Sequence, residues 1–434
     1  MSAQGPVSAS HSHAASIAYA VSTSPVERAP SIGRVNVTAI VVQDVFKVFG
    51  PGKSIDEAVQ RARKGETLSD IAKATGCTVA VNNASFEIEG PQIFVIMGLS
   101  GSGKSTLLRC VNYLLEPTSG LVKLGDQDLG AMDTKSLREL RKEKTAMVFQ
   151  HFGLLDNRDV LGNVGFGLEL RGVSESERTK KVKEVLELVG LSEHANTRID
   201  ELSGGMQQRI GLARALATDA DILLMDEAFS ALDPLIRTEM QTEFLDLQKQ
   251  MPKVVLFITH DLGEALRLGD RVAILKEGAI VQIDTPEQIV MNPQTEYVEA
   301  FVENVDRSRV LTAGAIAVEG DEVAVAPDLS VDDALNAMED AGSSVLYLVE
   351  DGRVRGIVHR RDLDRAPSKD NGTLQAVAAD APEPVHANDH LLDVIPRVAN
   401  HEIPLPVVDD ERRFIGLLSK TRILQAIARI KRHD

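Results

Sequence analysis

The chain has 434 residues, 43% of them hydrophobic, and a formal net charge of −17. This length allows roughly three domain-sized units that each bury a core. The acidic balance argues against nucleic acid as a partner, because phosphate neutralisation needs clustered Lys and Arg. The two cysteines are too few for a disulfide framework and favour a reducing compartment. A membrane-spanning helix needs about 18 to 20 consecutive apolar residues, and no segment of the sequence is apolar over that length.

The first 34 residues are rich in Ser and Ala and lack a basic start followed by an apolar run. They therefore do not resemble a signal peptide. We expect residues 1–34 to form a disordered tail.

A β-like pattern covers residues 35–50, and helical periodicity follows between residues 52 and 77. Alternating residues 79–88 then predict a strand, and the apolar run 92–97 predicts a buried one. We therefore expect a helical insert, 52–77, between two strands. Nucleotide binding by the loop that follows residue 97 does not require this insert.

A glycine-rich loop with the pattern of a phosphate-binding loop follows residue 97. Its glycines allow successive backbone N–H groups to surround phosphates, and the next helix directs its positive end at the same charge. Lys104 is predicted to reach the terminal phosphates, and Ser105 to ligate Mg²⁺. The residues expected to bind the nucleotide here are Gly98, Ser100, Gly101, Ser102, Gly103, Lys104, Ser105 and Thr106.

A second anion site is predicted about 100 residues later, in the segment LSGGMQQR that precedes a helical stretch. Amides at a helix N-terminus can receive a γ-phosphate. The expected nucleotide-binding residues of this segment are Ser203, Gly204, Gly205 and Gln207. Because an inserted region separates the two anion sites, the economical arrangement is a head-to-tail homodimer in which each segment closes the partner's ATP site.

Two carboxylates, Asp226 and Glu227, follow the apolar run 222–225. A central parallel strand delivers such residues to the carboxyl edge of its sheet. Asp226 is predicted to hold Mg²⁺, and Glu227 to act as the general base toward the attacking water.

Together the phosphate loop, the LSGGMQQR segment and the paired carboxylates resemble the ATP-binding subunit of an ABC transporter. The resemblance implies an α/β P-loop NTPase cassette over residues 35–305, with a helical subdomain at about 135–215, and it implies ATP and Mg²⁺ as cofactors. It also implies roles for three further residues. Gln150 would touch Mg²⁺ and the water, His260 would be the switch histidine that contacts the γ-phosphate, and Phe49 would stack on adenine, with Phe46 as the reserve or both as ordinary core residues.

The insert and the amino-acid sequence of residues 225–240 resemble those of the ATPases of glycine betaine/proline osmoprotectant importers. This resemblance implies transmembrane permease subunits and an extracytoplasmic substrate-binding protein or domain as partners. It places the chain peripherally on the cytoplasmic face of the inner membrane. The solute could also be choline or carnitine, because no residue of an ATPase subunit touches it.

Beyond residue 305 a weak repeat of about 60 residues predicts two β-α-β-β-α units, at about 308–370 and 373–434. They resemble an α+β tandem CBS module, which is regulatory and pairs its halves around adenine nucleotides in many proteins. The usual hydroxyl and carboxylate pattern is incomplete in both copies. The first copy has Asp362 but His359 in the hydroxyl position, and the second has Ser419 but Arg422 in the carboxylate position. A cyclic dinucleotide at the dimer interface is a further possible ligand.

A cluster of cations near the C-terminus offers a different regulatory signal. Such charges gain about 1 kcal/mol each near an anionic leaflet, and salt screens this attraction. We therefore expect regulation either by ionic strength or by a nucleotide, while a solvated helix end is the simpler interpretation of the cluster. Its members are Arg412, Arg413, Lys420, Arg422, Arg429, Lys431 and Arg432.

Two other functions fit parts of the sequence. A soluble ABC ATPase in repair or translation would be expected to have two fused cassettes, a long coiled insertion or a basic face. A regulatory ATP sensor without turnover would be expected to lack Glu227 or His260. The sequence therefore favours an ATPase that drives import.

Overall fold

The computed structural model describes residues 40–150, 153–320, 323–364 and 374–428. The expected tail 1–34 and the last three cations of the C-terminal cluster lie outside these ranges. Within them, no helix is both long and apolar enough to span a bilayer.

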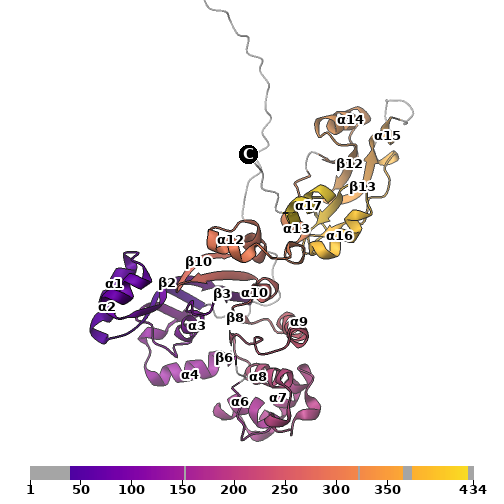
Figure 1. The fold of residues 1–434 in the computed structure, drawn as a ribbon. Coiled ribbons are helices and arrows are strands. Elements are labelled where there is room, and N and C mark those ends of the chain that lie inside the picture. Colours follow the sequence, from indigo (N-terminus) through magenta and orange to yellow (C-terminus); the bar gives the residue numbers. More distant parts are fainter. Residues whose placement is uncertain (1–39, 151–152, 321–322, 365–373, 429–434) are drawn as a thin grey trace, which may run out of the picture. The chain divides into compact units, whose positions relative to one another are not determined.

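The cassette is built on a six-stranded sheet with the order β10-β9-β3-β8-β7-β6 (Figure 1). All neighbours in it are parallel except β10 and β9. Alternate residues of β3 bury on opposite faces, with Ile93 and Val95 in one core and Phe94 and Ile96 in the other. Both faces are therefore covered, as the apolar run predicted. The strands are β3 (Gln92–Met97), β6 (Thr145–Val148), β7 (Ile222–Asp226), β8 (Val254–Thr259), β9 (Arg271–Lys276) and β10 (Ala279–Asp284).

A four-stranded antiparallel sheet with the order β2-β1-β4-β5 shares a core with one face of the large sheet. Helix α3 (Lys104–Val111) contributes Leu107 and Leu108 to this core, and α4 (Thr134–Lys144) contributes Leu140. The strands of the smaller sheet are β1 (Ile40–Phe49), β2 (Thr78–Ile88), β4 (Ser119–Leu124) and β5 (Gln127–Asp128).

Helices cover the other face of the large sheet and form a cluster around the LSGGMQQR segment. Because α4 packs in the core between the sheets and β6 belongs to the large sheet, this cluster begins at α5, later than the residue-135 start expected for the helical subdomain. Its helices are α5 (Val160–Val164), α6 (Phe166–Leu170), α7 (Glu175–Leu188) and α8 (Gly204–Ala217). The remaining cassette helices are α9 (Pro234–Gln250), α10 (Leu262–Leu268), α11 (Pro286–Met291) and α12 (Glu296–Val302).

The insert between β1 and β2 is a helical pair, α1 (Ile55–Arg63) and α2 (Leu68–Thr75), beside β2 in Figure 1. Its apolar side forms a small core with the end of β1, in which Ile71 and Phe46 are fully buried. The side chain of Thr67 caps α2, and Gly76 ends it with a left-handed φ of 68°. The insert therefore has a folded core of its own.

The C-terminal region contains the two β-α-β-β-α units that the repeat predicted, each with a three-stranded sheet. The first consists of β11 (Ala324–Val325), α14 (Val331–Asp340), β12 (Val345–Glu350), β13 (Arg353–His359) and α15 (Arg360–Leu363). The second consists of β14 (Val385–His386), α16 (Leu391–Ala399), β15 (Leu405–Val408), β16 (Phe414–Leu418) and α17 (Lys420–Ala428).

The two units exchange their leading segments, which the repeat pattern did not predict. Helix α13 (Ala313–Ile316), ahead of the first unit, joins the second through the Gly314 N–H and the Ala387 carbonyl at 2.8 Å. Ahead of the second unit, Ala379 exchanges two backbone hydrogen bonds with Ile357 of the first, at 2.8 and 2.9 Å. In addition, the buried Tyr347 hydroxyl of the first unit donates to the Pro404 carbonyl. The units therefore depend on each other for their backbone pairing.

Candidate ATP-hydrolysing site

The phosphate loop lies between the end of β3 and the start of α3, as its motif predicted. Gly103 precedes the helix with φ +98°, and a Cβ there would lie 2.0 Å from the carbonyl oxygen of Ala80. A Cβ at Gly98 would lie 2.3 Å from the carbonyl oxygen of Leu275. These glycines allow the loop to pack against neighbouring backbone and leave the first amides of α3 available to an anion.

Lys104 and Ser105 are the first two residues of α3, and their side chains have different hydrogen-bond partners. The Lys104 ammonium donates to the carbonyls of Gly98 and Leu99 at 2.8 and 3.0 Å, and burial lowers its pKa. Ser105 Oγ donates to Asp226 Oδ1 at 2.8 Å. The motif residues Ser105 and Asp226, which are 121 positions apart, thus form one oxygen-rich pair beside the phosphate loop.

Glu227 follows the buried strand β7 and adopts a left-handed conformation with φ +47°. Its N–H donates to the carbonyl of Ile258 on β8 at 3.0 Å, which fixes this unusual backbone. Glu227 Oε2 lies 3.2 Å from Gln150 Nε2 and 3.1 Å from His260 Nδ1. The carboxyl ends of three neighbouring strands, β6, β7 and β8, therefore bring together the three residues expected to perform hydrolysis.

The LSGGMQQR segment begins α8, and the Ser203 hydroxyl caps it by accepting from the Met206 N–H at 3.4 Å. Gln207 Nε2 donates to the carbonyls of Ile199 and Leu202, each at 3.1 Å. In this structure the amide of Gln207 therefore braces the loop ahead of α8. Its predicted contact with nucleotide stays a prediction, as do those of Ser203, Gly204 and Gly205.

The two phenylalanines considered for adenine stacking have different surroundings. Phe46 is fully buried against the insert, with the Arg63 guanidinium 5.3 Å from its ring centre. Phe49 is 42% exposed, with Lys47 Nζ 5.2 Å from its ring centre. Because only an exposed ring can accept a base, this arrangement favours Phe49 as the stacking residue.

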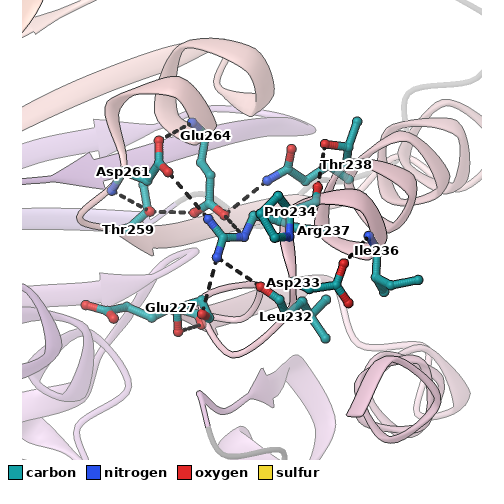
Figure 2. A network of polar contacts seen from close by, with 12 residues as sticks. Glu227, Leu232, Asp233, Pro234, Ile236, Arg237, Thr238, Thr259, Asp261 and Glu264 are labelled. Carbon is teal, nitrogen blue, oxygen red and sulfur yellow. Dashed lines mark hydrogen bonds and ion pairs between the residues drawn. The ribbon is translucent and has the colours of Figure 1, made fainter. Parts of the chain in front are cut away.

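Sequence reasoning missed a polar network beside this site, which Figure 2 shows around Arg237 and Glu264. It joins the turn after Glu227 to the turn around His260. The individual signals were weak, because an arginine one turn into a helix and a glutamate in the next helix are ordinary surface patterns.

The predicted regulatory residues are dispersed over the CBS units. Asp362 lies on α15, 3.8 Å from Arg361, and Ser419 accepts from the Arg422 N–H at 3.2 Å. Arg413 is paired with Asp409 and Glu411 at 2.7 and 3.1 Å. Arg422 Nε donates to the Ile316 carbonyl at 3.0 Å, whereas Arg412 and Lys420 are exposed.

Comparisons with known proteins agree with this architecture. The ABC transporter family model matches residues 81–230, and the CBS domain model matches residues 315–369 and 376–429. The glycine betaine transport ATP-binding protein OpuAA of Bacillus subtilis is 48% identical, with 90% of this chain and 92% of that protein aligned. The glycine betaine/carnitine transport ATP-binding protein GbuA of Listeria monocytogenes is 44% identical, with 90% and 98% aligned.

A solved structure, the dimeric cassette MJ0796 bound to ADP and Pi, is 29% identical and covers 57% of this chain and 98% of its own, with a TM-score of 0.48. The fold and the assembled motifs define an ABC-type ATPase cassette followed by a CBS pair. The chain belongs to the family of ABC transporter ATP-binding subunits. The chain is therefore an ATPase subunit.

Proposed function

We propose that this chain hydrolyses ATP to drive a membrane importer for glycine betaine and related compatible solutes. The observation that carries the hydrolytic part is the convergence of Gln150 and His260 on one carboxylate oxygen of Glu227. The solute class rests on relatives whose names specify glycine betaine transport and which align over about nine tenths of this chain.

Hydrolysis begins with phosphate binding by Lys104 and the loop amides. The Lys104 ammonium now bonds two backbone carbonyls and exchanges them for phosphate oxygens when ATP binds. The desolvated ammonium gains more from an anion than a hydrated one would.

The oxygen pair Ser105 and Asp226 fits Mg²⁺, which is commonly bound by one or two carboxylates together with substrate phosphates. Mg²⁺ bound there would neutralise charge on the phosphates. Ser105 Oγ and the Asp226 carboxylate would hold the ion. A single carboxylate would be sufficient, because Mg²⁺ sites of this kind also use substrate phosphates.

Glu227 accepts a proton from the attacking water, and its two neighbours orient it. Gln150 Nε2 and His260 Nδ1 both contact Oε2, which leaves Oε1 available to the water. The side chain of Glu227 is 16% exposed, whereas that of His260 is 52% exposed. His260 can therefore reach out to the γ-phosphate while it holds the general base.

We infer that two copies form the working ATPase, because the LSGGMQQR segment belongs to the helical cluster and the phosphate loop to the sheet edge. The first amides of α8 have no partners within the helix and suit a γ-phosphate from the other copy. The membrane partners are permease subunits, with the chain held at the cytoplasmic face, and an extracytoplasmic binding protein or domain delivers the solute.

We further propose that the CBS pair regulates the transporter through ionic strength. Of the described members of the cationic cluster, Arg412 and Lys420 are exposed, while Arg413 is neutralised by two carboxylates. Attraction between the two exposed cations and anionic lipid would weaken as salt rises. The nucleotide alternative is less favoured, because neither unit has both the hydroxyl and the carboxylate of the usual pattern.

A transport assay tests the proposal. The chain is reconstituted with its permease and binding protein in liposomes that contain ATP, and uptake of labelled glycine betaine, proline, carnitine and choline is compared. We expect ATP-dependent uptake of glycine betaine. ATP hydrolysis without uptake of any of the four solutes would refute the importer function while leaving the ATPase intact.

A further inference from the structure

The residues on either side of His260 form a local hydrogen-bond network with Glu264 of α10. Thr259 Oγ1 donates to Glu264 Oε2 at 2.5 Å and accepts from the Asp261 N–H at 3.0 Å. Asp261 Oδ1 in turn accepts from the Glu264 N–H at 3.2 Å. Glu264 is only 5% exposed, and its carboxylate holds Thr259 directly and the Asp261 N–H through the Thr259 hydroxyl.

The backbone after Glu227 is held by Arg237, from the first turn of α9. Arg237 Nη2 donates to the carbonyls of Leu232 and Ser230 at 3.0 and 3.4 Å. Ser230 in turn donates from its N–H and Oγ to the Glu227 carbonyl, at 3.1 and 2.9 Å.

Arg237 also reaches the histidine side of the network, as Figure 2 shows. Its Nη1 lies 3.6 Å from Asp261 Oδ2, and its Nε lies 3.8 Å from Glu264 Oε1. One guanidinium therefore spans the turn that follows the general base and the turn that carries the histidine.

Helix formation does not explain a cation at this position. A positive charge in the first turn of a helix opposes the helix dipole. The side chain of Arg237 is also only 27% exposed, so part of its hydration is lost. Its planar fork bonds two carbonyls through Nη2, and its charge lies between two carboxylates as ion pairs, while the buried Nε makes no hydrogen bond.

We propose that Arg237, paired with the buried Glu264, is a positioning residue that sets the Glu227–His260 geometry for hydrolysis. The inference rests on the proposed roles of Glu227 and His260. Because both backbone turns are tied to one side chain, a displacement of the turn at Ser230 is transmitted to His260. Loss of Arg237 leaves the phosphate loop intact and loosens the geometry of the base.

The test measures kcat and KM for ATP and the Kd of a fluorescent ATP analogue, using the full chain in its reconstituted transporter. We expect Arg237→Ala to lower kcat about 10- to 100-fold while KM and Kd change by less than about twofold. Arg237→Lys should recover part of kcat, because an ammonium keeps the charge but cannot span all four oxygen groups. Arg237→Ala combined with Glu264→Gln should lose little more than Arg237→Ala alone.

Arg267→Ala is the matched control. Arg267 donates to Gln241 Oε1 and Thr242 Oγ1, so these bonds go to α9 at the outer end of the same network and not to either turn. It should retain kcat within about twofold. The inference would be overturned if folded Arg237→Ala kept its kcat, or if Arg267→Ala lost as much kcat as Arg237→Ala. It would also be overturned if Arg237→Ala recovered its kcat in an assay run well below its melting temperature. Absence of hydrolysis by the unmodified transporter would instead refute the proposed function.

Discussion

Glu227 combines a strained backbone with two contacts to a single oxygen, a combination typical of functional sites. The left-handed φ is unfavourable, and the hydrogen bond from the Glu227 N–H to the Ile258 carbonyl on β8 stabilises it. The conformation directs the side chain toward Gln150 and His260. We therefore regard this residue as the point on which turnover depends.

Glu227→Gln should lower the ATP hydrolysis rate about 10²- to 10⁴-fold, because an amide cannot accept the proton of the attacking water. ATP binding should persist, since the phosphate loop is unchanged. Phosphate release and binding of a fluorescent ATP analogue measure the two effects. Near-normal hydrolysis by a folded variant would remove Glu227 from the role of general base.

Cys110 is fully buried on α3, and burial raises the pKa of its thiol to about 11. The reactive thiolate is therefore scarce until the pH approaches that value. In a Cys77→Ser background, Cys110 should not react with a thiol reagent at pH 8 in the native protein, and it should react fully after unfolding in guanidinium. Rapid native labelling would show that α3 opens or packs differently.

Strand β1 illustrates how one element serves both a core and a site. Its Phe46 packs in the core of the insert, whereas Phe49, at its end, is exposed. The insert thus covers one aromatic and leaves the other free. This gives the insert a structural role in supporting β1 beside the expected adenine position.

The two phenylalanines form a matched pair of variants. Phe49→Ala should raise the Kd for ATP about tenfold through loss of stacking, with little change in melting temperature. Phe46→Ala should destabilise the folded cassette by about 3–5 kcal/mol while leaving the Kd of the folded fraction unchanged. Titration with ATP and thermal unfolding distinguish the two. The opposite pattern would assign the stacking role to Phe46.

Features that depend on residues close together along the chain could be predicted from the sequence, whereas features that depend on distant residues could not. The phosphate loop, the Asp226–Glu227 pair and both β-α-β-β-α units depend on local patterns, so periodicity and motifs predicted them. The Arg237 network and the exchange of leading segments depend on contacts between elements distant along the chain. No local pattern encodes such contacts. The packing of Leu140 from α4 in the core between the sheets likewise depends on residues distant along the chain.

At the scale of the whole molecule, the exposed cations of the CBS pair predict salt-dependent transport. Arg412→Ala with Lys420→Ala should reduce the salt activation of uptake in vesicles with anionic lipid, because each charge contributes about 1 kcal/mol of attraction at low salt. Lys53→Ala with Lys64→Ala, two exposed cations of the insert, is the charge-matched control. Uptake measured against internal salt checks the effect, and unchanged activation in the first pair would refute it.

If ATP turnover in this chain drives glycine betaine import, the ATPase rate of the reconstituted transporter should respond to the solute. The rate is measured with and without glycine betaine and its binding protein, at a salt concentration that permits uptake. We expect the solute to raise the rate several-fold, and Glu227→Gln to abolish both the basal and the stimulated rates. A wild-type rate that does not respond to glycine betaine would contradict this coupling.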